Sequence, residues 1–215
     1  MTDRQMRNAL IQSAREMLAA GLVQGTGGNF SLRCEEGLII TPSGMEYNTL
    51  TPEDLPKLAL DGRVLEGRRA PSVENGLHRA IYRARRDVLA VVHTHSVCAS
   101  AASALRRALP ALLDNQAVLF GGAVPCAAYA PIGTPELAEN ALSALGRGFA
   151  VLLANHGAVC VGATLKEAES RCFMLELFAK VYFLTAGAGG AVALTEAEAK
   201  DEAEDMARRY GQQQK

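Results

Sequence analysis

The sequence predicts an α/β or α+β sandwich, in which helices cover a central sheet. Short apolar runs of strand length alternate along the chain with longer segments of helical spacing. Clusters of Gly, Pro and Asp separate these segments, as is typical of turns. At about 100–200 residues per domain, the 215 residues predict a single domain over 1–215. The chain is 49% hydrophobic and 21% charged, which excludes a predominantly disordered protein.

Turn and helix-start residues place the elements of the first third. Gly21 ends the first helical pattern, and Asp61-Gly62 is typical of a two-residue hairpin turn. Thr51, followed by Pro52 and two acidic residues, is a helix-start pattern. The expected elements are a helix over 3–20, strands over 30–34 and 38–41, a short helix from Thr51, and a hairpin of 58–60 with 63–65.

The rest of the chain predicts two buried strands and several helices. Two continuous apolar runs, 88–92 and 150–154, are typical of strands that are covered on both faces. The segment 116–129 is strand-like, although Gly121-Gly122 interrupts it. Capping residues or helical spacing predict helices over 73–86 (capped by Ser72), 96–109, 135–146, 164–185 and 195–210.

Charge and cysteine usage limit the partners and the compartment. The 22 Lys and Arg residues balance 23 Asp and Glu residues, so we expect neither a nucleic-acid nor a membrane partner. The five cysteines are widely spaced and form no CxxC pair, which suits a reducing compartment. The first ten residues are charged and lack the apolar core of a signal peptide. We therefore expect a cytoplasmic protein.

Three of the four histidines follow predicted strands. His93 and His95 are two positions apart, which places both side chains on one face of a strand. His156 follows the second buried strand. Three neutral imidazoles with an open fourth position are typical of catalytic zinc sites. An isolated HxH pair is also compatible with a buried structural pair, and spacing alone does not show that the three residues meet in space.

A carboxylate in the predicted helix 73–86 is the second candidate. Glu74 would lie in the first turn, where any acidic side chain complements the helix dipole. Beside a divalent cation, the same carboxylate could bind the metal or move a proton of a polarised substrate. His78 lies one turn later on the same helix face, and we interpret it as a structural residue.

Two small-residue loops, 26–29 and 41–44, are the third candidate. Successive free N–H groups in such loops form anion-binding nests, to which hydroxyl groups add donors. Together with Ser72, the loops could hold a phosphate without Lys or Arg. Neither loop matches a P-loop or a GxGxxG pattern, and ordinary turn chemistry explains the same residues.

These segments together resemble the class II aldolase and adducin head domain family, and in particular its aldolases that act on sugar phosphates such as L-fuculose 1-phosphate. The matching blocks follow the family order along nearly the whole chain. They are GGNFS at 27–31, TPSG at 41–44, PSVENGLH at 71–78, VVHTHS at 91–96, the segment 125–135, NHGAV at 155–159 and Tyr210-Gly211.

The resemblance implies a three-layer fold with a largely antiparallel central sheet between helices. It implies one Zn²⁺ per subunit, or Mn²⁺ or Co²⁺, held by His93, His95, His156 and Glu74. It also implies a homotetramer with sites between subunits, in which Tyr210 reaches a neighbouring site as a catalytic residue.

The implied reaction is the reversible cleavage of a ketose 1-phosphate, such as L-fuculose 1-phosphate, into dihydroxyacetone phosphate and an aldehyde. Glu74 would be the catalytic acid and base. The phosphate would bind to Gly28, Asn29, Ser43, Gly44 and Ser72. The alternatives are a dehydratase, 4-epimerase or decarboxylase that uses the same metal site, and an adducin-like interaction domain that lacks the metal.

Two positions depart from the family pattern. Val73 stands where a second Ser or Thr is usual, which removes a hydroxyl donor near the phosphate. The segment 111–115 lacks the Tyr that fuculose-type enzymes carry there, which leaves the aldehyde open. The epimerases have Asp at the position of Glu74, so the sequence favours an aldolase over an epimerase.

Overall fold

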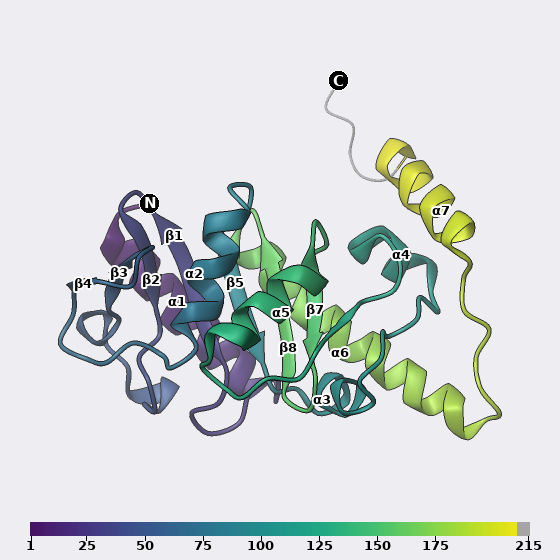
Figure 1. The fold of residues 1–215 in the computed structure, drawn as a ribbon, viewed down its shortest axis with the longest axis horizontal. Coiled ribbons are helices and arrows are strands. Elements are labelled where there is room, and N and C mark those ends of the chain that lie inside the picture. Colours follow the sequence, from purple (N-terminus) through teal and green to yellow (C-terminus); the bar gives the residue numbers. More distant parts are fainter. Residues whose placement is uncertain (210–215) are drawn as a thin grey trace.

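The centre of the fold is a sheet with the strand order β4-β3-β2-β1-β5-β8-β7-β6 (Figure 1). The structure is a computed structural model that describes residues 1–209. Within this range every neighbouring pair of strands is antiparallel except β6 and β7, which are parallel. The strands are β1 (Asn29–Cys34), β2 (Gly37–Ile40), β3 (Lys57–Ala59), β4 (Val64–Glu66), β5 (Ala90–Thr94), β6 (Cys126–Ala127), β7 (Ala150–Leu153) and β8 (Gly157–Gly162).

Helices cover both faces of this sheet and complete three layers. One face carries α1 (Asp3–Ala19), α3 (Val97–Ala104) and α6 (Leu165–Gly187), with α4 (Asp114–Phe120) against α6. The other face carries α2 (Asn75–Ala84) and α5 (Pro135–Leu145). Two short 3-10 helices, η1 (Tyr47–Thr49) and η2 (Pro52–Asp54), lie beside α1. The last helix, α7 (Glu196–Arg209), packs against α4 at one end of the molecule (Figure 1).

Successive side chains of the central strands enter two different cores. Val92 of β5 packs in the core beneath α1 and α6, whereas Val91 packs in the core beneath α2 and α5. Both valines are fully buried. Because β5 and β8 are covered on both faces, their sequences are continuously apolar rather than alternating. The predicted sandwich with a largely antiparallel sheet is therefore confirmed.

The predicted strand-like segment at 116–129 is wrong over most of its length. Its first part is α4, and only the two residues of β6 form a strand. The buried Gln116 side chain donates to the Pro110 carbonyl and accepts from the Leu112 N–H, which anchors the start of α4. Gly121 ends that helix with φ 76°, a left-handed conformation that favours glycine. The apolar content of a single helical turn resembles that of a strand, which explains the error.

Two predicted helix boundaries also differ from the structure. The helix expected over 73–86 begins at Asn75, with Glu74 as its N-cap residue instead of Ser72. The helix expected over 96–109 ends at Ala104, because Arg106 adopts a left-handed backbone conformation with φ 52°. The short helix expected at Thr51 is only the single 3-10 turn η2. The other predicted helices and the 58–65 hairpin are confirmed within two or three residues, as far as Arg209.

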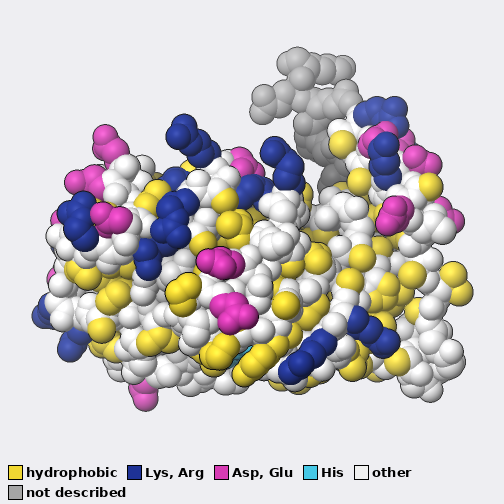
Figure 2. Space-filling model, viewed as in Figure 1, with side chains coloured by type: hydrophobic (Ala, Val, Ile, Leu, Met, Phe, Trp, Pro, Cys, Tyr) yellow, Lys and Arg dark blue, Asp and Glu magenta, His cyan; other side chains and the backbone are white. Residues whose placement is uncertain are grey.

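The face displayed in Figure 2 carries charged side chains of both signs, with hydrophobic side chains between them. Figure 2 shows basic and acidic side chains interspersed over the face that it displays, in agreement with a net charge of −1. No helix within residues 1–209 combines the length and the apolar character that crossing a membrane requires.

The surroundings of Asp54 in η2 indicate how the stability of the fold depends on pH. Its buried carboxylate accepts hydrogen bonds from Thr51, Arg68 and Arg69. Burial alone raises the pKa of Asp54, but these bonds outweigh it and hold the pKa well below its usual range. The group therefore stabilises the fold above its unfolded pKa of about 3.9, and this stabilisation is lost as the pH falls toward the folded pKa.

We expect Asp54→Asn to lower the free energy of unfolding at pH 7 and to lose less stability than the parent between pH 5 and pH 2. Urea titrations at several pH values measure both effects. Asp201→Asn, on the exposed surface of α7, is the matched control and should leave the pH profile of the parent unchanged. A parallel profile for Asp54→Asn and the parent would contradict the assignment.

Candidate metal centre and active site

The three histidines predicted to bind a metal meet at one end of β5 and β8. His93 is the fourth residue of β5, and His95 follows the strand directly. His156 precedes β8 in a turn where Asn155 has φ 56°. Because β5 and β8 are antiparallel neighbours, the end of one meets the beginning of the other. The ring centroids of the histidines are 4.6 to 5.0 Å apart, so the three side chains meet in space; their role as metal ligands stays a prediction.

Glu74 turns its carboxylate toward the histidines instead of capping its own helix. As the N-cap residue of α2 it makes no capping hydrogen bond. Its Oε2 lies 3.3 Å from His93 Nε2, and its Oε1 lies 3.6 Å from His156 Nε2. The sequence left two interpretations of Glu74 open, and the geometry favours the one in which its carboxylate lies beside the histidines over the one in which it only complements the helix dipole.

The donor atoms of this cluster fit a divalent cation. One ligand atom from each of Glu74, His93, His95 and His156 can be chosen so that all lie within 4.8 Å of one another. Glu74 Oε1 and both ring nitrogens of His156 are buried without a hydrogen-bond partner, which is costly unless something else binds them. Three imidazoles and a carboxylate are ligands that Zn²⁺ accepts.

Two histidines and the carboxylate of the cluster are already in the forms that bind a metal. Burial, together with the neighbouring His93, lowers the pKa of His95 and of His156 to about 4, so both are neutral at pH 7. Burial raises the pKa of Glu74, but His93 and His156 lower it by more, so its carboxyl group is ionised. For His93, burial lowers the pKa but the Glu74 carboxylate raises it by more, as expected for two groups that face each other without a cation between them. His93 Nδ1 lies 2.9 Å from the Ala158 carbonyl oxygen and must donate to it, which leaves Nε2 directed at the cluster.

The same end of the sheet holds a cavity of about 270 Å³. Glu74, His95 and His156 line it together with the loops 26–29 and 42–44. All five residues predicted to bind a phosphate line this cavity: Gly28, Asn29, Ser43, Gly44 and Ser72. Their role as phosphate ligands stays a prediction. Asn29 has a further contact, because its Nδ2 donates to Glu74 Oε2 over 2.8 Å.

Two glycines allow the loops to approach the histidines closely. Gly28 has φ 76°, and a Cβ there would lie 2.6 Å from the His93 carbonyl oxygen. A Cβ on Gly157 would lie 2.3 Å from the Thr94 carbonyl oxygen and 3.0 Å from the His95 ring. The Tyr47 hydroxyl donates to the carbonyl oxygens of Gly27 and Gly28, which fixes the first loop. Sequence reasoning missed Tyr47, because nothing local links it to that loop.

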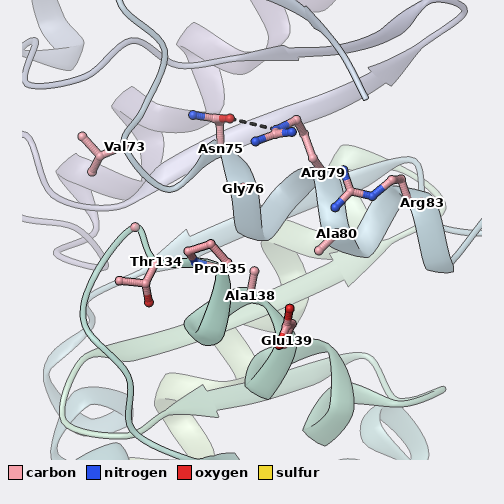
Figure 3. A pocket seen from close by; sticks show the side chains of 11 residues that line it. Val73, Asn75, Gly76, Arg79, Ala80, Arg83, Thr134, Pro135, Ala138 and Glu139 are labelled. Carbon is pink, nitrogen blue, oxygen red and sulfur yellow. Dashed lines mark hydrogen bonds between the residues drawn. The ribbon is translucent and has the colours of Figure 1, made fainter. Parts of the chain in front are cut away.

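A second cavity of about 300 Å³ lies between α2 and α5 (Figure 3). It is a neighbour of the metal site and shares only Val73 with it. Arg79 and Arg83 of α2 and Glu139 of α5 line it, and Arg79 donates to Asn75 Oδ1 over 2.9 Å (Figure 3). No histidine lines this cavity, so the candidate active site is the cavity beside the histidines.

Tyr210, the remaining predicted site residue, lies outside the described residues.

The sequence profile described as Class II Aldolase and Adducin N-terminal domain matches residues 8–183, a range that includes all four candidate metal ligands. The chain belongs to this family. It is an enzyme of the lyase class, as the sequence predicted, and class II aldolases use a divalent metal.

Named relatives and a solved structure are similar to this family member over most of its length. The 5-deoxy-D-ribulose 1-phosphate aldolase of Bacillus thuringiensis serovar kurstaki is 40% identical over 96% of this chain and 97% of its own. The L-fuculose phosphate aldolase of Escherichia coli K12 is 37% identical over 86% of each chain. A solved L-fuculose 1-phosphate aldolase superposes with a TM-score of 0.92 and 34% identity over 96% of this chain and 98% of its own.

Proposed function

We propose that this class II aldolase reversibly cleaves a ketose 1-phosphate into dihydroxyacetone phosphate and an aldehyde. The observation that carries the proposal is one cavity lined by both the histidine–glutamate cluster and two loops rich in backbone N–H and hydroxyl donors. The histidine–glutamate cluster can hold a divalent cation, and the two loops can hold a phosphate. We propose Zn²⁺ as the cation, with Mn²⁺ and Co²⁺ as the ions to compare.

Glu74 is placed to move the proton of the reaction. A bound cation supplies a Lewis acid that polarises the substrate carbonyl group. Cleavage breaks the C3–C4 bond: the hydroxyl group on C4 loses its proton as the aldehyde forms, and C3 of the three-carbon product gains one. Glu74 lines the cavity and has one oxygen without a protein partner, so its carboxylate can first take up the proton that the C4 hydroxyl group loses and then deliver it to C3.

The phosphate is proposed to bind to neutral donors. Among residues 1–209, neither Lys nor Arg lines the cavity, so the backbone N–H groups of loops 26–29 and 42–44 would hold the anion. The hydroxyl groups of Ser43 and Ser72 add donors at the same wall. This arrangement supports the roles that the resemblance implied for Gly28, Asn29, Ser43, Gly44 and Ser72.

The aldehyde is proposed to be short and to end in a methyl group. Ile132 lines the cavity and is 62% exposed, so it offers apolar surface to the substrate. L-fuculose and 5-deoxyribulose, the sugars in the names of the relatives, both end in a methyl carbon. A methyl end needs no hydrogen-bond partner, so apolar surface is sufficient to accommodate it.

Release of dihydroxyacetone phosphate from a panel of sugars tests the function. The panel contains the 1-phosphates of L-fuculose, L-rhamnulose, ribulose, 5-deoxyribulose and 5-methylthioribulose, with and without a chelator, and the free sugars as controls. Release that requires metal and phosphate is expected, and it should be fastest for methyl-ended sugars. No release from the zinc-loaded protein would overturn the proposal and would favour a dehydratase, epimerase or decarboxylase at this site.

Val73→Ser tests the phosphate wall. A hydroxyl group at this position would restore a donor, and a hydrogen bond to a charged group contributes about 1.5–3 kcal/mol. We expect KM for the preferred sugar phosphate to fall about 3- to 10-fold, because part of that gain is lost to solvent. Val97→Ser, a substitution of an exposed valine outside the cavity, is the control and should leave KM unchanged. A higher KM for Val73→Ser would place the phosphate elsewhere.

We propose that the chain is a single cytoplasmic domain over 1–215 that assembles as a homotetramer with sites between subunits. All five cysteines are free thiols in the structure, which supports a reducing compartment.

In a homotetramer with sites between subunits, Tyr210 would serve the site of a neighbouring subunit. A chain that ends at Arg209 is expected to lose turnover with little change in unfolding temperature. Unchanged kinetics would exclude a role of Tyr210, and light scattering measures the assembly.

A further inference from the structure

A chain of buried polar side chains ends at Glu74. The Tyr82 hydroxyl lies 2.8 Å from Ser31 Oγ, which lies 2.6 Å from His78 Nδ1. His78 Nε2 lies 2.5 Å from Asn29 Oδ1, and Asn29 Nδ2 lies 2.8 Å from Glu74 Oε2. All five residues are buried. This chain of residues is named the relay below.

The relay joins one face of a helix to one face of a strand. Glu74, His78 and Tyr82 are four residues apart along α2 and its N-cap, so they lie on one helix face. Asn29 and Ser31 are two residues apart in β1, so they lie on one strand face. The strand residues therefore fit between the helix residues, and each polar side chain contacts the next.

The direction of every hydrogen bond in the relay follows from its end. An ionised carboxylate only accepts, so Asn29 donates with Nδ2 and accepts with Oδ1. His78 must then carry its hydrogen on Nε2, which leaves Nδ1 to accept from the Ser31 hydroxyl. The Tyr82 hydroxyl donates to the Ser31 carbonyl oxygen over 3.0 Å and also contacts Ser31 Oγ. From Ser31 onward, every donor points toward Glu74.

The relay distinguishes the two oxygens of Glu74. Oε2 is held by Asn29, whereas Oε1 has no hydrogen-bond partner and lies 3.6 Å from His156 Nε2. Burial, and to a smaller extent His93, lowers the pKa of His78 to about 3, so its imidazole is neutral and keeps one donor and one acceptor. A neutral His78 agrees with the hydrogen-bond directions derived from Glu74.

We propose that His78 is a positioning residue of the reaction, which acts through Asn29 to hold Glu74 Oε2 and to leave Oε1 for the cation and the substrate proton. This inference rests on the proposed function of Glu74. It assigns to His78 more than the structural role expected from the sequence. Its contribution is to the geometry of Glu74, so removal of His78 should affect kcat more than KM.

Two substitutions of His78 separate positioning from packing. His78→Leu removes both the donor and the acceptor, whereas His78→Gln can still donate to Asn29 and accept from Ser31. Loss of a hydrogen-bond partner behind a metal ligand costs about 10- to 100-fold in activity. In His78→Leu we expect kcat to fall by this factor, while KM changes less than about threefold. In His78→Gln we expect most of the parent kcat to be retained. Wild-type kcat in folded His78→Leu would overturn the proposal.

Variants farther along the relay protect the test against misfolding. Ser31→Ala leaves His78 Nδ1 without a donor and should lower kcat in a folded protein, while Tyr82→Phe should be nearly neutral because Ser31 remains. If His78→Leu does not fold, the test rests on Ser31→Ala, and an unchanged kcat of Ser31→Ala would overturn the proposal. Equal loss of kcat in Ser31→Ala and Tyr82→Phe, in proportion to their loss of unfolding temperature, would also overturn it.

The visible absorption of Co²⁺-loaded protein gives a readout without turnover. The bands report the ligand geometry of the ion, so a displaced Glu74 should shift them in His78→Leu and Ser31→Ala and not in Tyr82→Phe. A wild-type spectrum in both relay variants would overturn the positioning role. If the parent protein cleaves no sugar in the panel, the proposed function fails, while the spectra still test whether His78 positions Glu74.

Discussion

Replacing His95 by alanine is expected to abolish both metal binding and turnover. His95 is neutral at pH 7, because burial lowers its pKa to about 4, and its Nε2 lies 2.8 Å from His93 Nε2 in the cluster. Its removal leaves two imidazoles and one carboxylate for the cation. His95 also borders Gly27 and Gly157, where its ring fills the space that a Cβ would occupy. Elemental analysis of the purified variant and the cleavage assay measure the two effects.

His78→Gln is the matched control for metal content. It also removes one imidazole near the site, yet His78 offers no atom to the cluster. We therefore expect one equivalent of metal in His78→Gln and none in His95→Ala. Full metal content in His95→Ala would contradict the assignment of the site.

Unfolding temperature gives an independent measure of the same prediction. A ligand that binds only the folded state stabilises it by about 2.7 kcal/mol at a concentration 100 times its Kd. Added Zn²⁺ should raise the unfolding temperature of the parent protein and leave that of His95→Ala unchanged. The comparison also shows whether His95→Ala is folded, because the metal-free parent and the metal-free variant should unfold at similar temperatures.

The histidines of the cluster could be predicted because each of them follows a continuous run of apolar residues, 88–92 or 150–154. His93 and His95 share a strand face by spacing alone. Their meeting with His156 depends on the neighbouring positions of β5 and β8, where Val92 pairs with Cys160 and Thr94 with Ala158. That pairing is not encoded locally. The resemblance to a family supplied what spacing could not.

The orientation of Glu74 shows the limit of local reasoning. The sequence places a carboxylate near a helix start, and a carboxylate there can cap the helix or leave it. Asn29, which is far away in the sequence, decides the outcome by donating to Oε2. The spacing of Glu74, His78 and Tyr82 was visible in the sequence, but its meaning required the adjacent strand face of Asn29 and Ser31. The helix α4 was missed for a similar reason. The Gln116 side chain anchors its start by donating to the Pro110 carbonyl group, which lies outside the helix and leaves no helical spacing in the sequence.

Glu74→Gln is expected to keep the fold and to lower turnover by about 10²- to 10⁴-fold, the usual contribution of a positioned acid or base. The substitution has nearly the same shape, and the amide oxygen can still accept from Asn29 Nδ2. What it loses is the ionised oxygen Oε1, which lies 3.6 Å from His156 and has no other partner. An amide neither accepts a proton at neutral pH nor matches the charge of a carboxylate toward a cation.

Because Glu74 is a candidate for both metal ligand and base, its two roles must be separated. Turnover of Glu74→Gln is therefore measured over a range of Zn²⁺ concentrations until it no longer rises. A ligand role alone would restore turnover at saturating metal, since three histidines remain, whereas a base cannot be restored in this way. We expect the loss to persist at saturation, with Glu46→Gln, an exposed residue outside the cavity, as the unaffected control. Near-normal turnover of Glu74→Gln at saturating metal would assign the proton transfer to another group.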